Sequence, residues 1–295
     1  MALRARKPVV KEERFKAVIY ANRGVGKTHF CCSFPNTYFI DTEGIDSYKH
    51  FMQMLDDNNS MLSRINELSE IIEEVKQLLS VKHDYKTLVI DSITFPFHLL
   101  SNFEAERLAK KSKDGSEGTE YGANMAKAKR LTFELGMLLT RLDMNVIVSC
   151  HEKTKYEKGV EIGKAADINE KLEYALGSVI NLRRQGKKIK AFVDKSRYPA
   201  LPTGEAIDFE NGYEVLKSIF GAEVFEKPSV NEILATPEQL EEVRTLIMNL
   251  AVPEEWLNKR IASCRASTLE QLSEKDMQDL IDLMLERIKK KGASL

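Results

Sequence analysis

The chain has 295 residues, of which 30% are charged and 43% hydrophobic, as is usual for a globular protein with one large domain and a small appendage. Its formal net charge of −1 excludes a global basic field, so any site for a polyanion such as nucleic acid must be local. No apolar run reaches membrane-spanning length, which argues against a membrane partner.

The N-terminus and the cysteines both indicate a cytoplasmic protein. Residues 1–13 are basic but lack the apolar core of a secretory signal, and we expect them to form a flexible arm. Cys31, Cys32, Cys150 and Cys264 show no spacing typical of a metal site. We therefore predict reduced thiols packed in a core, as in a protein of a reducing compartment.

Strand-like and helical segments alternate as far as residue 149. The strand-like runs are 14–20, 37–41, 86–91 and 144–149, and the helical patterns are 47–55, 61–80, 95–110 and 121–142. This alternation predicts an α/β fold with a mostly parallel sheet flanked by helices. Farther on, two strand-like runs in residues 178–196 flank Gln185 and Gly186, which indicates a hairpin.

The chain ends in a predicted all-α module. Residues 226–235 read as a linker between a large domain, 14–225, and this small C-terminal module, 236–295. Thr236 opens the module with a capping box that includes Gln239, and two further helices follow. Because the module is slightly acidic, we expect it to dock a partner, or to cap the large domain, rather than to bind DNA.

The segment VIYANRGVGKTHF, residues 18–30, follows the pattern of a phosphate-binding loop (P-loop), G-x-x-x-x-G-K-[ST], with one departure. Ala21 stands where the first glycine belongs, at the strand exit and away from the phosphates. The later glycines let backbone N–H groups surround the phosphates, Lys27 reaches the β- and γ-phosphates, and the Thr28 hydroxyl binds Mg²⁺. The sequence therefore predicts a site for ATP and Mg²⁺. Its cofactor-binding residues are Asn22, Arg23, Gly24, Val25, Gly26, Lys27, Thr28 and His29.

Two further strands end in carboxylates that belong beside this loop. The strand TLVID delivers Asp91, followed by Ser92, to the Mg²⁺ shell. The segment YFIDTEG, residues 38–44, brings Asp41 and Glu43 to the same edge of the sheet. A carboxylate there can orient and deprotonate an attacking water. The alternative for each of these two residues is a helix cap.

Together these motifs resemble those of the RecA-like ATPases. The resemblance implies a RecA-like sheet in which Glu43 is the catalytic base. It also implies that a polar sensor at the end of a later strand contacts the γ-phosphate, and VIVSCH offers Ser149 and His151 at that place.

The same resemblance extends to a finger segment. VDKSRYPALPTG, residues 193–204, matches the family's K-x-[KR] segment, so Lys195 and Arg197 are expected to enter the ATP site of the neighbouring subunit. There they would neutralise charge on the transferring phosphoryl group. A homo-oligomer, either a ring or a filament with composite ATP sites, is therefore implied. The alternative for both residues is a solvated edge strand.

Within that superfamily the chain is similar to compact phage-type members, which include the Sak-group single-strand-annealing ATPases and related phage nucleotide-binding proteins. The shared features are the short spacing from the P-loop to FIDTEG, Tyr121-Gly122 before a long helix, NVIVSCHEK and KSRYPALPTG, all within residues 14–215. The resemblance implies recombination on single-stranded DNA, by annealing or strand exchange, in the cytoplasm of a bacterial host.

Two segments match the loops with which RecA-like proteins bind single strands, residues 110–122 and 152–170. Tyr121 and Tyr156 are candidates for stacking on bases. Basic residues flank the first segment or crowd the predicted hairpin; they are Arg107, Lys127, Lys129, Arg130, Arg183, Arg184, Lys187, Lys188 and Lys190. For any one residue of the two loop segments a solvated loop is the alternative. The cations of the hairpin could contact either phosphate or an acidic neighbour.

The sequence therefore predicts a Mg²⁺-dependent ATPase that assembles on single-stranded DNA. Two alternatives remain open, a motor such as a replicative helicase or helicase loader, and a scaffold that binds ATP without hydrolysing it. The C-terminal module is the expected docking site for a partner such as a single-strand-binding protein.

Overall fold

The structure is a computed structural model, and it describes residues 13–111, 119–157, 159–231 and 233–292. Nearly all of the predicted N-terminal arm and most of the first predicted DNA loop lie outside these residues. None of the helices formed by the described residues is both long enough and apolar enough to cross a membrane.

A nine-stranded sheet forms the centre of the part of the chain that the structure describes. The strands are β1 (Lys16–Ala21), β2 (Thr37–Asp41), β3 (Met61–Arg64), β4 (Thr87–Asp91), β5 (Asn145–Glu157), β6 (Val160–Ala166), β7 (Ser178–Gln185), β8 (Lys188–Ser196) and β9 (Ala206–Asp208). Their order is β3-β2-β4-β5-β1-β7-β8-β9, and β6 pairs with β5 outside this row. The strands from β3 to β7 in this row are parallel, whereas β8, β9 and β6 are antiparallel to their neighbours.

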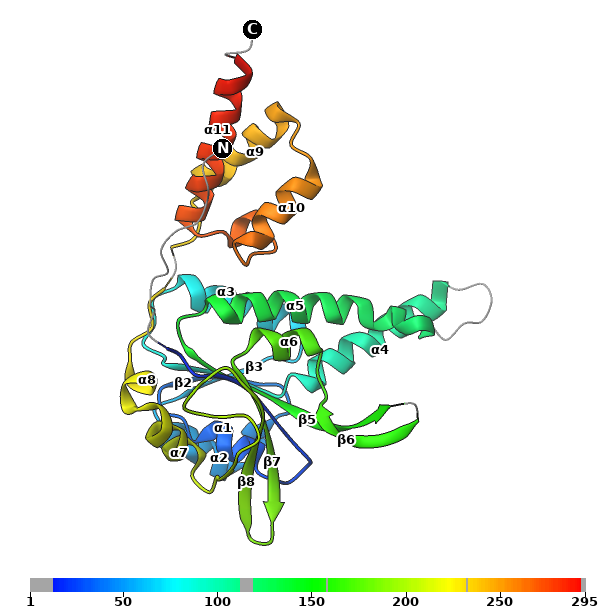
Figure 1. The fold of residues 1–295 in the computed structure, drawn as a ribbon, viewed down its shortest axis with the longest axis vertical. Coiled ribbons are helices and arrows are strands. Elements are labelled where there is room, and N and C mark those ends of the chain that lie inside the picture. The colour runs from blue at the N-terminus through cyan, green and yellow to red at the C-terminus, as the bar shows by residue number, and fades with distance from the viewer. Residues whose placement is uncertain (1–12, 112–118, 158, 232, 293–295) are drawn as a thin grey trace.

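Helices cover both faces of the sheet (Figure 1). The α-helices are α1 (Lys27–Cys32), α2 (Lys49–Asp57), α3 (Leu68–Ser80), α4 (Thr94–Lys111), α5 (Ala126–Arg141), α6 (Glu170–Ala175), α7 (Gly212–Phe220), α8 (Ala222–Glu226), α9 (Pro237–Leu250), α10 (Glu254–Ser263) and α11 (Glu274–Gly292). The described residues also form the short 3₁₀ helices η1 (Ile45–Ser47), η2 (Glu120–Met125) and η3 (Leu269–Gln271). The predicted fold class is confirmed: a mostly parallel sheet lies between helices, and a helical segment ends the chain.

Alternating side chains of the strands contribute to two separate hydrophobic cores. In β1, Val18 and Tyr20 face the core that contains α3, α5 and α6, whereas Ala17 and Ile19 face the core that contains α1, α2 and α7. Because both faces are covered, almost every residue of the central strands is buried. The sheet therefore holds the carboxyl ends of its strands in fixed positions.

The predicted helix over residues 61–80 is wrong at its start. Residues 61–64 form strand β3, and α3 begins only at Leu68. Leu62 and Ile65 extend the three- and four-residue spacing of α3, which is why the pattern indicated too long a helix. The segment instead pairs in parallel with β2 and satisfies backbone groups at the sheet edge.

The predicted DNA loop over residues 152–170 is also different in the structure. Strand β5 continues beyond residue 149 to Glu157 and pairs with β6, forming a hairpin that projects from the sheet (Figure 1). Most side chains of this hairpin are at least partly exposed on both faces. With little of either face buried, the segment lacks the apolar alternation that marks a half-buried strand.

The C-terminal helices form as their caps predict. The Thr236 hydroxyl accepts the Gln239 backbone N–H, and the Gln239 side chain accepts the Thr236 N–H, which completes the capping box. Helices α9, α10 and α11 pack around a third hydrophobic core, with Val243 and Met284 fully buried and Trp256 partly buried at its edge.

Candidate nucleotide site

Four neighbouring strands bring the predicted groups to one edge of the sheet. Strands β2, β4, β5 and β1 lie side by side and are parallel, so their carboxyl ends meet. The P-loop follows β1, Glu43 follows β2, Asp91 ends β4, and His151 lies in β5. This is the edge at which open α/β sheets bind ligands.

Ala21, the departure from the P-loop pattern, is the last residue of β1. It is 1% exposed and pairs with His151 in the ladder between β1 and β5. Its backbone is that of a strand, which any residue can adopt, so no glycine is needed here. The Lys27 Nζ donates to the Ala21 carbonyl oxygen at 3.1 Å. The alanine therefore leaves the loop geometry intact.

The two remaining loop glycines, in contrast, have backbones that require glycine. Gly24 has φ of 72° and Gly26 has φ of 117°. A Cβ on Gly26 would lie 3.1 Å from Cδ1 of Ile189 in β8. The hairpin formed by β7 and β8 also contacts the loop through Arg184, whose Nη2 donates to the Gly24 carbonyl oxygen at 3.4 Å. The β7–β8 hairpin therefore lies against the P-loop.

The carboxylates of Asp41 and Glu43 differ in burial and in hydrogen-bond partners. Asp41 is fully buried and accepts the backbone N–H groups of Glu43, Gly44 and Ile45 at 2.8–2.9 Å, so it caps the turn. Glu43 is partly exposed, and its Oε1 lies 2.8 Å from His151 Nε2. The hydrogen bond with His151 lowers the pKa of Glu43, although burial opposes it. Glu43 is therefore a carboxylate at neutral pH and can accept a proton.

Asp91 is 2% exposed and lies close to Thr28 of the P-loop. Its Oδ1 accepts a hydrogen bond from Ser149 Oγ, whereas Oδ2 is buried without a partner among the described residues. Burial raises the pKa of Asp91, and interactions with Ser149 and Thr28 oppose this shift. An unsatisfied buried carboxylate oxygen close to a threonine hydroxyl matches the oxygen ligands that Mg²⁺ prefers, so these residues fit Mg²⁺.

A pocket of about 490 Å³ lies above these groups. Most of the predicted residues line it, together with two rings that the motifs did not indicate; the lining is Arg23, Gly24, Gly26, Lys27, Thr28, His29, Glu43, Phe51, Phe95 and His151. The side chains of two of the predicted cofactor-binding residues lie elsewhere. Asn22 Oδ1 accepts the backbone N–H of Arg23 at 2.7 Å, and Val25 packs in a hydrophobic core.

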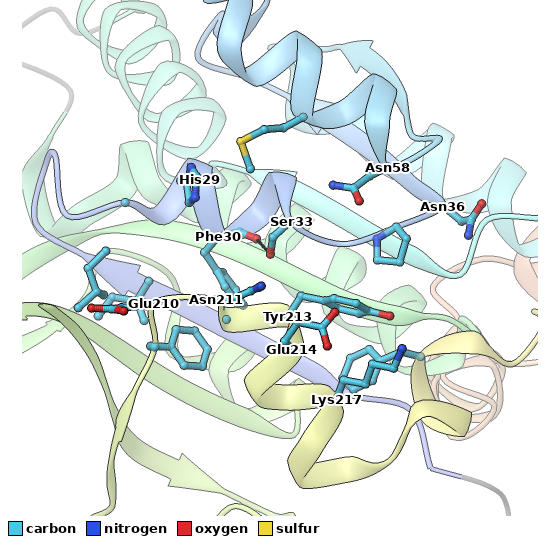
Figure 2. A pocket seen from close by; sticks show the side chains of 18 of the residues that line it. His29, Phe30, Ser33, Asn36, Asn58, Glu210, Asn211, Tyr213, Glu214 and Lys217 are labelled. Carbon is cyan, nitrogen blue, oxygen red and sulfur yellow. Dashed lines mark hydrogen bonds between the residues drawn. The ribbon is translucent and has the colours of Figure 1, made fainter.

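A second pocket, of about 750 Å³, begins at the same loop, and we call it the α1 groove (Figure 2). Gly26 and His29 line both pockets. From there the groove follows α1 toward Asn36 and is bordered by the first turns of α7, where Tyr213 and Lys217 point into it (Figure 2). Its walls come from segments far apart in the sequence, which explains why no motif indicated it.

The two predicted finger residues do not line the pocket of their own chain. The Lys195 Nζ donates to the carbonyl oxygens of Glu173 and Leu176, and it lies 5.5 Å from the ring centre of Tyr174. The Arg197 Nη2 donates to the Tyr174 carbonyl oxygen at 2.7 Å. Both cations are therefore bound to the carboxyl end of α6.

Ser92 is a site residue to which the motifs assign no function. It is fully buried, and its Oγ donates to Glu43 Oε1 at 2.5 Å. The sequence shows that Ser92 follows Asp91, but only the folded sheet places its hydroxyl beside the carboxylate of another strand.

Comparison with known proteins identifies the large domain. The AAA domain family matches residues 13–204. No curated protein matches the chain in sequence. A RadB recombinase structure has a TM-score of 0.40 at 16% identity, over 65% of this chain and 84% of that one. A KaiC-like protein from Pyrococcus horikoshii OT3 has a TM-score of 0.39 at 14% identity, over 66% and 85%. Neither structure is similar enough to bear on function.

Proposed function

The chain belongs to the AAA domain family, and on that premise we propose that it hydrolyses ATP with Mg²⁺. The observation that carries the proposal is the convergence of Lys27, Glu43 and His151 on one pocket, with the buried Asp91 close to Thr28 of its lining. These groups supply a cation for the phosphates, a base for water and a ligand for the metal. A protein that only binds nucleotide has no need of the base.

The reaction assigns one task to each group. Lys27 binds the β- and γ-phosphates. The oxygen of a water attacks the γ-phosphorus while Glu43 accepts the proton of that water. The bond from the γ-phosphorus to the bridging oxygen breaks, its electron pair leaves with ADP, and inorganic phosphate is the second product. His151 serves as the sensor of the γ-phosphate.

Two residues would hold the metal. Thr28 Oγ1 and Asp91 Oδ2 are the oxygen atoms suited to Mg²⁺, the latter because it is buried without a partner among the described residues. Mg²⁺ bound there supplies positive charge that offsets the negative charge gathering on the phosphates. It also compensates for the cost of burying the Asp91 carboxylate.

The α1 groove is our proposed site for the nucleoside. It shares Gly26 and His29 with the phosphate pocket, so a nucleotide held by the P-loop can extend into it. Its lining includes the largely buried rings of Phe30 and Tyr213 and the amide of Asn211 (Figure 2). Phe209 also belongs to the lining. Such a mixture of apolar faces and a few polar groups is typical of small-molecule sites.

A second copy of the chain is proposed to complete the site. Arg23 and Lys27, both from the P-loop, are the Lys and Arg side chains among the described residues that line the pocket. Charge developing on the transferring phosphoryl group calls for a further cation. Lys195 and Arg197 are our candidates, acting from a neighbouring subunit of a homo-oligomer.

Single-stranded DNA is the proposed partner, and two projecting elements support it. The 3₁₀ helix η2, which precedes α5, carries Tyr121, which is completely exposed and has a positive φ of 53°. Lys110, Lys111 and Lys129 are exposed on the flanking helices. The β5–β6 hairpin carries the exposed Tyr156. Aromatic rings beside lysines suit the bases and phosphates of a single strand.

The test is ATP turnover by the purified full-length chain with Mg²⁺, with and without single-stranded DNA. We expect release of ADP and phosphate, a loss of rate when Mg²⁺ is removed, and a higher rate with single-stranded DNA. Tight ATP binding without product would indicate the non-hydrolysing scaffold instead. Processive unwinding of a forked duplex would indicate the motor.

A further inference from the structure

The backbone of Glu43 is tied to the end of strand β4. The Thr42 N–H donates to the Asp91 carbonyl oxygen at 2.9 Å. The Thr42 hydroxyl donates to the Ser92 carbonyl oxygen at 2.7 Å and accepts the Ser92 N–H at 3.0 Å. With Asp41 capping the same turn, Glu43 has little freedom of backbone position relative to Ser92.

The two oxygens of the Glu43 carboxylate have different surroundings. Oε1 accepts the Ser92 hydroxyl at 2.5 Å and lies 2.8 Å from His151 Nε2. Among the residues that the structure describes, none forms a hydrogen bond with Oε2. Ser92 is fully buried and follows β4, whereas the His151 side chain is about one-third exposed and comes from β5. Side chains from two segments, the end of β4 and strand β5, therefore hold the same oxygen.

We propose that Ser92 and His151 are positioning residues that hold Oε1 of Glu43 and thereby direct Oε2 toward the attacking water. This inference rests on the proposed function, since it assumes that Glu43 is the base of ATP hydrolysis. The physical reason is geometric. A carboxylate free to rotate about its side-chain bonds presents either oxygen in many directions, whereas one anchored on a single oxygen presents the other in one direction.

Of the two positioning residues, Ser92 allows the clearer test. Its hydroxyl is buried and hydrogen-bonds Glu43, whereas His151 borders the pocket and can also contact a phosphate. Ser92→Ala removes one oxygen atom. We expect its kcat for ATP to fall roughly 10- to 100-fold, the cost of a displaced catalytic group, with the Kd for ATP unchanged.

A double-mutant cycle with Glu43→Gln separates positioning from a structural role. If Ser92 acts through Glu43, Ser92→Ala lowers kcat in the wild-type background and has no further effect in the Glu43→Gln background. Equal losses in both backgrounds, or weakened ATP binding, would show that Ser92 only supports the local structure and would overturn the proposal.

Ser178→Ala is the matched control. Ser178 is fully buried in β7, its hydroxyl has no partner among the described residues, and it lies at the opposite end of the sheet from the P-loop. We expect this variant to keep the wild-type kcat. If the Ser92 variant does not fold, His151→Ala and His151→Gln provide a second test. The glutamine retains an N–H donor and should keep more activity than the alanine; equal rates for the two would overturn the proposal.

The outcomes distinguish this inference from the proposed function. An inactive Glu43→Gln beside a fully active Ser92→Ala would overturn the positioning role and leave the function standing. A fully active Glu43→Gln would overturn the base, and with it both proposals.

Discussion

The nucleotide edge of the sheet and the C-terminal module are stabilised in different ways. At the nucleotide edge, Thr42 and Ser92, fifty positions apart, hydrogen-bond each other, and Asp41 caps the turn beside Thr42. In the module, helices α9, α10 and α11 pack around their own core of aliphatic and Met side chains. One region is specified by directional bonds between strands, and the other by burial of apolar faces.

Polar contacts join the module and its linker to the large domain. Gln271 Nε2 donates to Glu134 Oε1 of α5 at 2.7 Å, and Asn231 Nδ2 donates to the carbonyl oxygens of Leu78 and Val81 at the end of α3. The catalytic groups that one chain is proposed to supply to its own site, Lys27, Glu43 and His151, lie at the nucleotide edge. The residues proposed for catalysis are therefore different from the residues that attach the module to the large domain. A mutation can disturb either set without the other.

The largest expected effect comes from the P-loop lysine. Lys27→Ala removes the cation that would contact the β- and γ-phosphates, so we expect hydrolysis to disappear and ATP binding to weaken. Unfolding midpoints of the variant and wild type without nucleotide check that the fold is intact. A variant that binds and hydrolyses ATP normally would show that the nucleotide lies elsewhere.

The second-largest loss of ATP hydrolysis is expected from replacing Arg197 of the proposed finger. Arg197→Ala should bind ATP and hydrolyse it roughly 10³-fold more slowly, because a finger arginine stabilises transition-state charge. Mixing it with Lys27→Ala protein should restore part of the activity, since each variant supplies the group that the other lacks. Lys187→Ala, at the exposed tip of the β7–β8 hairpin, is the control. A wild-type chain that is monomeric and hydrolyses ATP at its full rate would rule out action in trans.

A smaller effect is expected on DNA binding. Replacing Lys110 and Lys111 with alanine should weaken binding of single-stranded DNA, because fewer phosphates are then neutralised. The slope of log K against log salt should decrease by about 0.7 for each phosphate that no longer has a lysine partner. Fluorescence anisotropy over a salt series measures this slope. An unchanged slope would place the strand elsewhere on the molecule.

The smallest effect on chemistry should follow removal of the module. A chain ending at Asn231 keeps every proposed catalytic group and the bonds from Asn231 to α3, so we expect kcat and the Kd for ATP to be unchanged. The function that it should lose is co-operation with a partner such as a single-strand-binding protein. A truncated chain that folds but no longer binds ATP would make the module part of the site.

The P-loop and the strands that end in a carboxylate could be predicted because the residues that define each of them are adjacent in the sequence. The spacing of Gly26, Lys27 and Thr28 fixes a loop, and an apolar run ending in Asp91 fixes a strand end. The two errors of secondary structure, at residues 61–64 and 152–170, concern elements at or beyond the sheet edge. Their pairing is decided by tertiary contacts, which periodicity does not record.

The parts of the site that were missed depend on distances between strands. Ser92 is significant because its hydroxyl faces Glu43, and Phe95 because α4 places it in the pocket. The α1 groove requires α7, which lies far along the chain from the P-loop. The finger residues were named from sequence, yet their proposed partner is a second copy of the chain, so they stay a prediction.

Glu43→Gln offers the most direct measurement. The substitution removes the proton acceptor but keeps the size of the side chain and an oxygen for Ser92 and His151 to contact. With Mg²⁺ and radiolabelled ATP under single-turnover conditions, we expect unchanged ATP affinity and hydrolysis slower by roughly 10²- to 10⁴-fold, the usual contribution of a general base. Hydrolysis at the wild-type rate with equal affinity would contradict the proposal that this edge of the sheet is the active site of an ATPase with Glu43 as its base.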